Sequence, residues 1–466
     1  MIGGSIAGMC AAQAIAPHFR RVTLLDRDEL PAGPDGRAGV PQGRHIHGLL
    51  AGGARALEAL FPGFGARMVE RGAHRVDLFH DFAVLRPVGW FPRMRSNVPF
   101  LSASRGLTEA TVRALLRATP NVTTVERTDV TGLAISDGRV TGVTTRRRGG
   151  DAGALAADLV IDCSGRSSRA LDWLRAADAE VPGEEVVDAF GGYSSRWYQA
   201  PPPERWPRSW WWRGISIEPT PEHMIGAVLY PVDGDRWILT LGGYSKHYPP
   251  TDEAGFDAAL RALRTPLVAE AIALAEPISP VHGHRSFANR FRRYDRLRAP
   301  LAGFVALGDS VCAVNPFYGQ GMTASALSAH NLAAWLRATA GPIGSAEARR
   351  FYRSQAALLD DIWTISTSAD FAFPGTAGTR PFGSSVLKRI GDVVADVSRT
   401  DPVVLQHLAE VFHVLRPVSS LMAPSLVARV ATRAAQRWVT RALGSVRSEP
   451  EELRSAARQL LRVEGP

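Results

Sequence analysis

Residues 1–8 read MIGGSIAG, and residues 22–26 read VTLLD. A glycine-rich turn, a helix of small and apolar residues (6–16 here) and an apolar strand ending in an acidic residue form half of a dinucleotide-binding βαβ unit. The helix would direct its positive N-terminal end at a pyrophosphate, and Asp26 would bind a ribose. The stretch therefore predicts an α/β fold organised around a Rossmann-like unit.

The three glycine places of this motif hold Gly3, Ser5 and Gly8. Ser5 puts a hydroxyl where backbone usually approaches the phosphates. A glycine-rich turn before a helix is also often only a loop, but the acidic residue at the expected spacing favours a binding site. Two residues precede the turn, so we expect the chain to begin inside its first strand.

The composition is that of a soluble globular enzyme: 466 residues, 45% of them hydrophobic and 21% charged. There is no membrane-length apolar run and no leader-like start, so we expect a cytoplasmic protein. The net charge is +9, but the arginines are scattered apart from 146–148, which favours an anionic small ligand over nucleic acid. The three cysteines lack disulfide or metal spacing and are expected to be reduced and buried.

Residues 41–47, PQGRHIH, gather polar side chains ahead of a helix at 54–60. The spacing of His45 and His47 does not suit a metal site, and no carboxylate or cysteine lies nearby, so no metal is predicted. We expect Arg44 to reach an anionic group of a cofactor and both histidines to form local hydrogen bonds.

The middle of the chain alternates between helical and strand patterns. A helix is expected at 108–118, strands at 121–125 and 130–133, a hairpin with an Asp137-Gly138 turn, and a buried strand that ends near Gly165. Residues 186–248 are rich in strands and tryptophan, which is typical either of a sheet core or of an apolar substrate cavity. The candidate substrate residues in this lobe are Tyr193, Arg196, Trp210, Trp212 and Trp237.

A second informative stretch runs from 301 to 322. A buried strand ends at Gly308-Asp309, and NPFYGQGM at 315–322 opens a helix at 323–338. That helix would stabilise negative charge on a bound ring, and Gly319 and Gly321 would let backbone approach the ring. Further helices are expected at 346–365, 384–397, 402–415 and 424–443, and from Glu451. They could close the active site, form a dimer interface or only cover the sheet.

These elements, in this order, resemble the FAD-dependent monooxygenases of the aromatic-hydroxylase superfamily. Residues 41–47, 192–196, 234–237 and 318–322 are similar to a bacterial branch that includes polyether-type polyene epoxidases. The resemblance implies a Rossmann-like FAD-binding domain (1–175 and 296–345), an inserted β-rich substrate lobe (176–295) and a C-terminal helical region (346–466).

The resemblance also implies the cofactor residues. Arg105 would bind a phosphate or the ribitol, Val130 the adenine through its backbone, and Asp309 the ribityl or pyrophosphate region. The full predicted set is Gly3, Ser5, Gly8, Asp26, Arg27, Arg44, Arg105, Val130, Gly165, Asp309, Pro316, Gly319, Gly321 and Met322.

The chemistry implied is reduction of the flavin by NAD(P)H, formation of a flavin hydroperoxide with dioxygen and transfer of one oxygen atom. We expect epoxidation of an alkene in a polyketide- or terpenoid-like substrate of secondary metabolism, since no catalytic acid or base is identifiable by spacing. Alternatives are hydroxylation of a phenol, reduction of isoprenoid double bonds and a degenerate flavin-binding scaffold. A halogenase is disfavoured because no lysine precedes Lys246 and 210–212 lacks the W-x-W-x-I-P signature.

Overall fold

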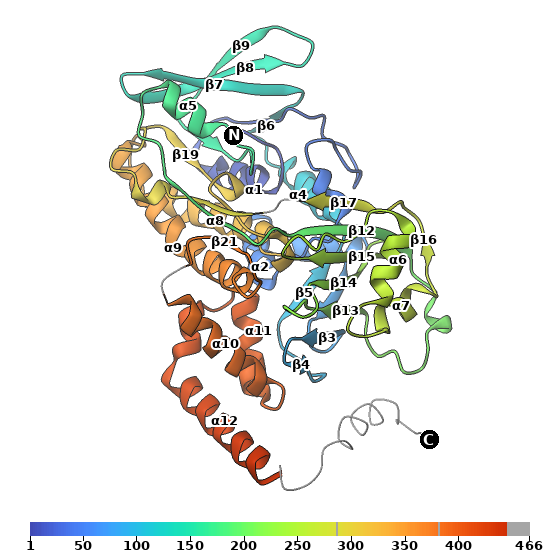
Figure 1. The fold of residues 1–466 in the computed structure, drawn as a ribbon. Coiled ribbons are helices and arrows are strands. Elements are labelled where there is room, and N and C mark those ends of the chain that lie inside the picture. Colours follow the sequence, from blue (N-terminus) through green and yellow to red (C-terminus); the bar gives the residue numbers. More distant parts are fainter. Residues whose placement is uncertain (286–287, 381–382, 445–466) are drawn as a thin grey trace.

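The computed structural model describes residues 1–285, 288–380 and 383–444, and the helix expected from Glu451 lies outside them. Figure 1 shows the region around α1, a β-rich lobe beside it, and helices α10 to α12 extending below both. The helices are α1 (Ile6–Ile15), α2 (Ala51–Leu60), α3 (Phe64–Glu70), α4 (Arg105–Leu116), α5 (Ala170–Ala176), α6 (Glu253–Arg261), α7 (Leu267–Ile272), α8 (Gly321–Arg337), α9 (Ser345–Asp370), α10 (Ser384–Ser398), α11 (Pro402–Phe412) and α12 (Pro424–Gly444).

Most of the helices expected from the sequence are present within a few residues of their predicted bounds. Helix α9 is the main exception, because it continues to Asp370 rather than ending near 365. None of the helices in the described ranges combines the length and apolarity needed to cross a membrane.

Two parallel strand pairs form the Rossmann-like sheet: β1 (Val22–Leu25) with β6 (Val122–Val125), and β10 (Val160–Asp162) with β19 (Phe304–Ala306). Ile2 bridges the pairs through Leu25 and Asp162, both in parallel. The spatial order is therefore that of a doubly wound sheet, with Ile2 at the place of the central first strand. Beside it is a hollow of about 160 Å³, lined in part by Met1, Thr23 and Leu159.

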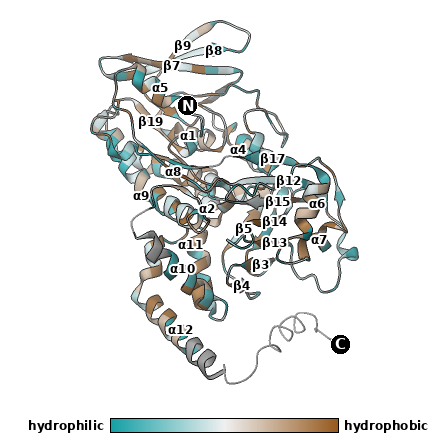
Figure 2. Cartoon of the chain, in the orientation of Figure 1, coloured by the Kyte–Doolittle hydropathy of each residue, from teal (hydrophilic) through white to brown (hydrophobic). Residues whose placement is uncertain are grey.

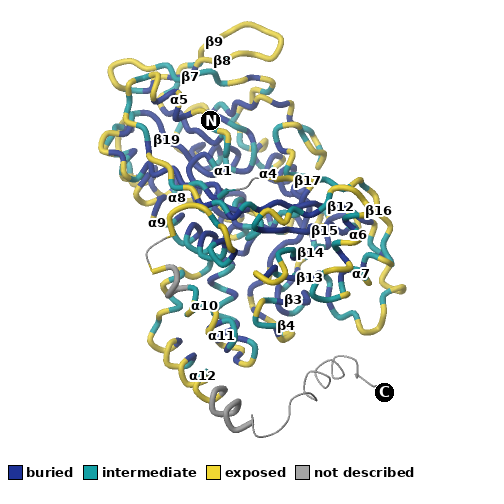
Figure 3. Tube along the Cα trace, in the orientation of Figure 1, coloured by how far each residue is buried: buried dark blue, intermediate teal, exposed yellow. Residues whose placement is uncertain are grey.

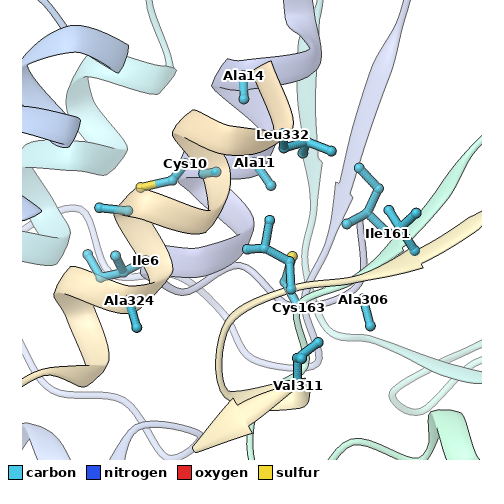
Figure 4. Close-up of a cluster of buried hydrophobic side chains, with 14 of the residues drawn as sticks. Ile6, Cys10, Ala11, Ala14, Ile161, Cys163, Ala306, Val311, Ala324 and Leu332 are labelled. Carbon is cyan, nitrogen blue, oxygen red and sulfur yellow. The ribbon is translucent and has the colours of Figure 1, made fainter. Parts of the chain in front are cut away.

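Helices α1 and α8 pack closely because their facing side chains are small. Figure 4 shows Cys10 and Ala11 of α1 near Ala324 and Leu332 of α8, with Cys163 beneath them. Cys10, Cys163 and Cys312 are all buried and unpaired, which confirms the sequence prediction.

A large sheet forms the β-rich lobe. Its strand order is β16 (Glu276–Pro277), β12 (Gly192–Gln199), β15 (Arg236–Gly243), β14 (Ile225–Val232), β13 (Gly214–Ile217), β3 (Phe82–Arg86) and β4 (Gly89–Trp90), with β17 (His282–Arg285) also paired to β12. Strands β3 and β4 come from the segment assigned by sequence to the cofactor domain. The lobe is therefore not built from 176–295 alone, because β13 pairs in parallel with β3.

Three smaller sheets complete the fold: β7 (Thr128–Ser136), β8 (Arg139–Arg147) and β9 (Ala152–Ala156); β2 (His74–Asp77) and β5 (Pro99–Ser102); and β20 (Cys312–Ala313), β18 (Asn289–Arg292), β11 (Glu184–Asp188) and β21 (Ala377–Gly378). Asp137 and Gly138 join β7 to β8 with φ of 51° and 70°, which confirms the expected two-residue turn. Figure 3 shows the tip of the β8–β9 hairpin exposed, while buried residues gather in the centre.

The large sheet has two different apolar faces, since side chains alternate along each strand. One face carries Trp237 and Leu239 and is covered by Phe256 of α6 and Val268 of α7. The other carries Phe82 and Val84 and packs against Leu405 and Ala409 of α11. Figure 2 shows hydrophobic residues concentrated in these strands, whereas α12 alternates between hydrophobic and hydrophilic positions.

We predict that Ile2→Ala lowers the free energy of unfolding by about 3 kcal/mol, because a large aliphatic side chain is removed from the core between the two strand pairs. Ile2 is 6% exposed, whereas Ile135 on β7 is 36% exposed. Denaturant unfolding should therefore show a change below about 1 kcal/mol for the control Ile135→Ala. Equal losses for both variants would contradict the burial of the Ile2 side chain in the core.

Candidate active site

The glycine turn before α1 is packed so closely that side chains cannot enter it. Gly3 has φ +98°, and a β-carbon on it would lie 2.6 Å from the carbonyl oxygen of Cys163. A β-carbon on Gly8 would lie 1.8 Å from the carbonyl oxygen of Gly3. The start of α1 is thereby held against the glycine turn, and the first backbone N–H groups of the helix have no partner within it.

Asp26 lies beside this turn and fixes it. Its Oδ2 accepts a hydrogen bond of 2.6 Å from the backbone N–H of Gly4, while its Oδ1 accepts from the Asp28 backbone and from Arg37 Nη1. The side chain is 5% exposed. Sequence reasoning missed Arg37, which lies in an irregular loop without any periodic signal.

Arg37 belongs to a buried cluster of charges that leads to the turn. It pairs with Glu109 at 3.1 Å, and Arg105 also contacts Glu109, at 3.2 Å. Burial acts to raise the pKa of Glu109, but Arg105 and Arg37 together lower it. Arg105 Nη2 then donates to the hydroxyl of Ser5 at 2.7 Å, so a cation stands directly beside the N-terminus of α1.

Asp309 lies beside the start of α8, where the charges of Arg166 and Arg105 act on it. Burial raises the pKa of its carboxyl group, although Arg166 and Arg105 act to lower it. No residue in the described ranges donates a hydrogen bond to it, whereas Arg166 is held by the carbonyl oxygens of Ala288 and Val314. Sequence reasoning placed the turn after β10 near the cofactor but did not single out Arg166.

The loop at 44–48 crosses one face of the large sheet and is fastened there. His45 Nδ1 lies 2.8 Å from Ser195 Oγ, which lies 2.6 Å from Thr240 Oγ1. Trp197 Nε1 donates to the carbonyl oxygen of Arg44 at 2.9 Å. This face of β12 and β15 is therefore the one that meets the site.

Both histidines of this loop are held neutral. Burial lowers the pKa of His45 to about 3 and that of His47 to about 4. His47 Nδ1 lies 3.0 Å from the carbonyl oxygen of His45, so the expected local hydrogen bonding is confirmed. The described part of the chain contains no group of three side chains suited to bind a metal ion.

The loop at 315–319 meets the 44–48 loop through glycines. A β-carbon on Gly48 would lie 3.8 Å from the Cα of Gly319 and 4.0 Å from the hydroxyl oxygen of Tyr230. Gly319 has φ +67°, and α8 begins two residues later at Gly321. We call the junction of Gly48, Gly319 and Tyr230 the ring site.

The structure brings together Gly3, Ser5, Gly8, Asp26, Arg105 and Asp309, and it places Gly321 and Met322 at the start of α8 beside Asp309. Gly165 lies in the turn after strand β10, three residues beyond Asp162. Arg27, Arg44 and Pro316 are exposed, and Val130 is half-buried on β7. All of these cofactor assignments stay predictions.

The predicted substrate residues separate onto the two faces of the sheet. Tyr193 lies on the site face, with its ring 4.4 Å from that of His45. Arg196 pairs with Glu253 of α6 at 2.8 Å on the opposite face. Trp212 and Trp237 are each 2% exposed in the core under α6 and α7, with Trp210 packed beside them. Strand alternation directs Arg196 and Trp237 away from the ring site, and Trp210 and Trp212, from the loop before β13, pack in the same cluster as Trp237.

Comparison with known proteins identifies the family. Two sequence profiles described as FAD dependent oxidoreductase match residues 102–335 and 1–178. Protein Rv3254 of Mycobacterium tuberculosis (strain ATCC 25618 / H37Rv) is 30% identical, with 94% of each chain covered.

The chain belongs to the FAD-dependent oxidoreductases.

Solved structures share the fold of this oxidoreductase at low sequence identity. The flavin-dependent brominase Bmp2 has a TM-score of 0.65 at 12% identity, with 88% of this chain and 92% of that chain covered. The p-nitrophenol 4-monooxygenase PnpA of Pseudomonas putida DLL-E4 has a TM-score of 0.62 at 16% identity, with 88% and 97% covered. PqsL of Pseudomonas aeruginosa has a TM-score of 0.58 at 18% identity, with 80% and 96% covered.

The residues around the glycine turn of this FAD-dependent oxidoreductase fit the cofactor of its family. The N-terminus of α1, Arg105 and Arg166 supply the positive charge that a pyrophosphate needs. Asp309, which accepts no hydrogen bond from the described chain, would accept hydrogen bonds from ribityl hydroxyl groups.

We predict that Arg105→Met weakens FAD binding about 10- to 100-fold, because a charge-assisted hydrogen bond to the pyrophosphate is lost. Equilibrium dialysis of the holoprotein measures the change. Arg175→Met is the control, since the Arg175 side chain is 60% exposed in a surface pair with Asp172. Equal FAD retention by the two variants would remove Arg105 from the cofactor site.

Proposed function

We propose that this FAD-dependent oxidoreductase is a monooxygenase that uses NAD(P)H and dioxygen to epoxidise an alkene of an apolar substrate. FAD supplies the redox chemistry: once reduced, it activates dioxygen, so that one oxygen atom enters the substrate and the other leaves as water. The chain itself binds the cofactor, orients the substrate and excludes water.

The apolar surroundings of the ring site support this proposal. Tyr230 lies 5.1 Å from the ring of Phe82 and 6.1 Å from that of Phe100, measured between ring centroids. Leu405 and Ala409 of α11 cover the same cluster. Such surroundings favour an apolar substrate and keep bulk water from the reacting atoms.

The protonation states near the ring site favour an alkene over a phenol. Hydroxylation of a phenol benefits from a base whose pKa is close to the working pH, whereas epoxidation needs no protein base. His45 and His47 have pKa values of about 3 and about 4, and burial raises the pKa of Tyr230 to about 12. At neutral pH the histidines are weak bases and the tyrosine is protonated. This observation carries the choice of epoxidation.

Halogenation receives no support from the site. The reaction requires an active-site lysine, and the sequence contains only Lys246 and Lys388. Lys246 is exposed, with its ammonium 5.1 Å from the ring centroid of Phe190, and Lys388 pairs with Asp392 on α10. Neither lies at the ring site.

We expect the purified protein to carry a flavin absorption spectrum and to oxidise NAD(P)H faster when an apolar polyene is added. With ¹⁸O₂, mass spectrometry of the product should show one labelled oxygen in an epoxide. Incorporation into a phenol but not into an alkene would replace epoxidation by hydroxylation. Saturation of a double bond without incorporation of oxygen would instead identify a reductase. A protein that binds flavin but does not oxidise NAD(P)H would support the flavin-binding scaffold.

A further inference from the structure

A buried carboxylate stands behind the loop that forms one side of the ring site. Asp370, the last residue of α9, is 1% exposed. Its Oδ1 accepts hydrogen bonds from the Tyr318 hydroxyl at 2.8 Å and from Asn315 Nδ2 at 2.9 Å. Its Oδ2 accepts from Asn289 Nδ2 of β18 at 2.6 Å. One side chain therefore ties together three separate segments of the chain.

These hydrogen bonds fix the 315–319 loop directly. The backbone N–H of Asn315 donates to Asn289 Oδ1 at 2.7 Å, and the backbone N–H of Phe317 donates to Asn315 Oδ1 at 3.0 Å. Asn315 and Tyr318 thus reach Asp370 with their side chains while the same loop carries Gly319 into the ring site. Movement of the carboxylate would release the loop at two points.

The site around Asp370 is unusual because its charge has no cationic partner. No ion pair to it occurs among the described residues, and the ionisable groups that face it are Tyr318, Tyr244 and Asp188 of β11. Tyr244 donates to the Tyr318 hydroxyl at 3.3 Å, and burial raises the pKa of both phenols well above 10. A carboxylate buried without a cation costs free energy, so its three donors are what keep it ionised.

We propose that Asp370 is a positioning residue whose carboxylate holds the 315–319 loop in the conformation that receives the flavin ring. The inference rests on the FAD site described above and not on the identity of the oxygenated substrate. Failure to find an epoxide would therefore leave it intact.

Protonation of Asp370 gives the proposal a distinctive pH dependence. Burial raises its pKa to about 6, although hydrogen bonds from Tyr318, Asn315 and Asn289 act to lower it. The native state therefore holds this proton more tightly than the unfolded chain. The contribution of Asp370 to stability is fully present below the unfolded pKa, near 4, and is lost as the pH rises through about 6.

FAD retention should change in the opposite direction. The ionised carboxylate accepts all three hydrogen bonds, whereas the protonated form has one acceptor oxygen occupied by hydrogen and loosens the loop. Retention should therefore increase as the pH rises through about 6 and level off above about 7. A residue that only supported the fold would make stability and retention change together.

The test compares the wild-type holoprotein with Asp370→Asn and with Asp361→Asn. Asp361 lies on the same helix, and burial also raises its pKa, but it accepts from the Val418 backbone, away from the loop. FAD retention is measured by dialysis between about pH 5 and about pH 8, with the flavin spectrum recorded at each pH. Asp370→Asn should bind FAD about tenfold more weakly near pH 7.5 and lose the pH dependence, while Asp361→Asn keeps it.

A second variant keeps the proposal testable if Asp370→Asn does not fold. Tyr318→Phe removes one donor and leaves the carboxylate in place, so the midpoint of FAD retention should move to higher pH. Unchanged pH dependence in both variants, or a wild-type protein whose FAD retention is flat across this range, would overturn the proposal.

Discussion

The contact between α1 and the turn that precedes it determines the geometry of the cofactor site. Gly8 lies so close to the carbonyl oxygen of Gly3 that a β-carbon would overlap it at 1.8 Å. Asp26, which follows strand β1, accepts a hydrogen bond from the backbone N–H of Gly4. The first contact is between backbone atoms, and the second is made by a carboxylate that is 5% exposed. The start of α1 is therefore held against the glycine turn, and its N-terminal amides are fixed with it.

The second helix of the site depends on the first. Helix α8 packs against α1 through small side chains such as Cys10 and Ala324, which belong to the buried cluster drawn in Figure 4. This packing places Gly321, at the start of α8, beside Asp309. The N-termini of α1 and α8 consequently belong to the same packed pair of helices. A larger residue at either small position would separate them, because a close-packed interior cannot absorb added volume without moving backbone.

Local sequence patterns predicted the elements of this fold better than their assembly. The glycine turn, the acidic residue after β1 and the helix after 322 all have signals within a few residues, and each is present. Arg37 has no such signal, because its partners Asp26 and Glu109 are distant in sequence. The sequence correctly assigned the tryptophans to the β-rich lobe. The alternation of side chains along a strand does not say which face of the sheet the 44–48 loop contacts. That choice is made by His45 and Ser195, 150 residues apart.

The C-terminal region, for which the sequence left three roles open, contributes directly to the site. Asp370 at the end of α9 holds the 315–319 loop, and His413 after α11 supports the start of α2, where the backbone N–H of Ala51 donates to its Nδ1 at 3.2 Å. Since α2 follows the 44–48 loop, each loop of the ring site rests on a polar group from the last hundred residues. The N-terminal glycine turn can bind a pyrophosphate by local geometry, but the ring site requires α9 and α11 to be in place. Folding of the C-terminal helices is therefore a condition for a complete site rather than a later addition to it.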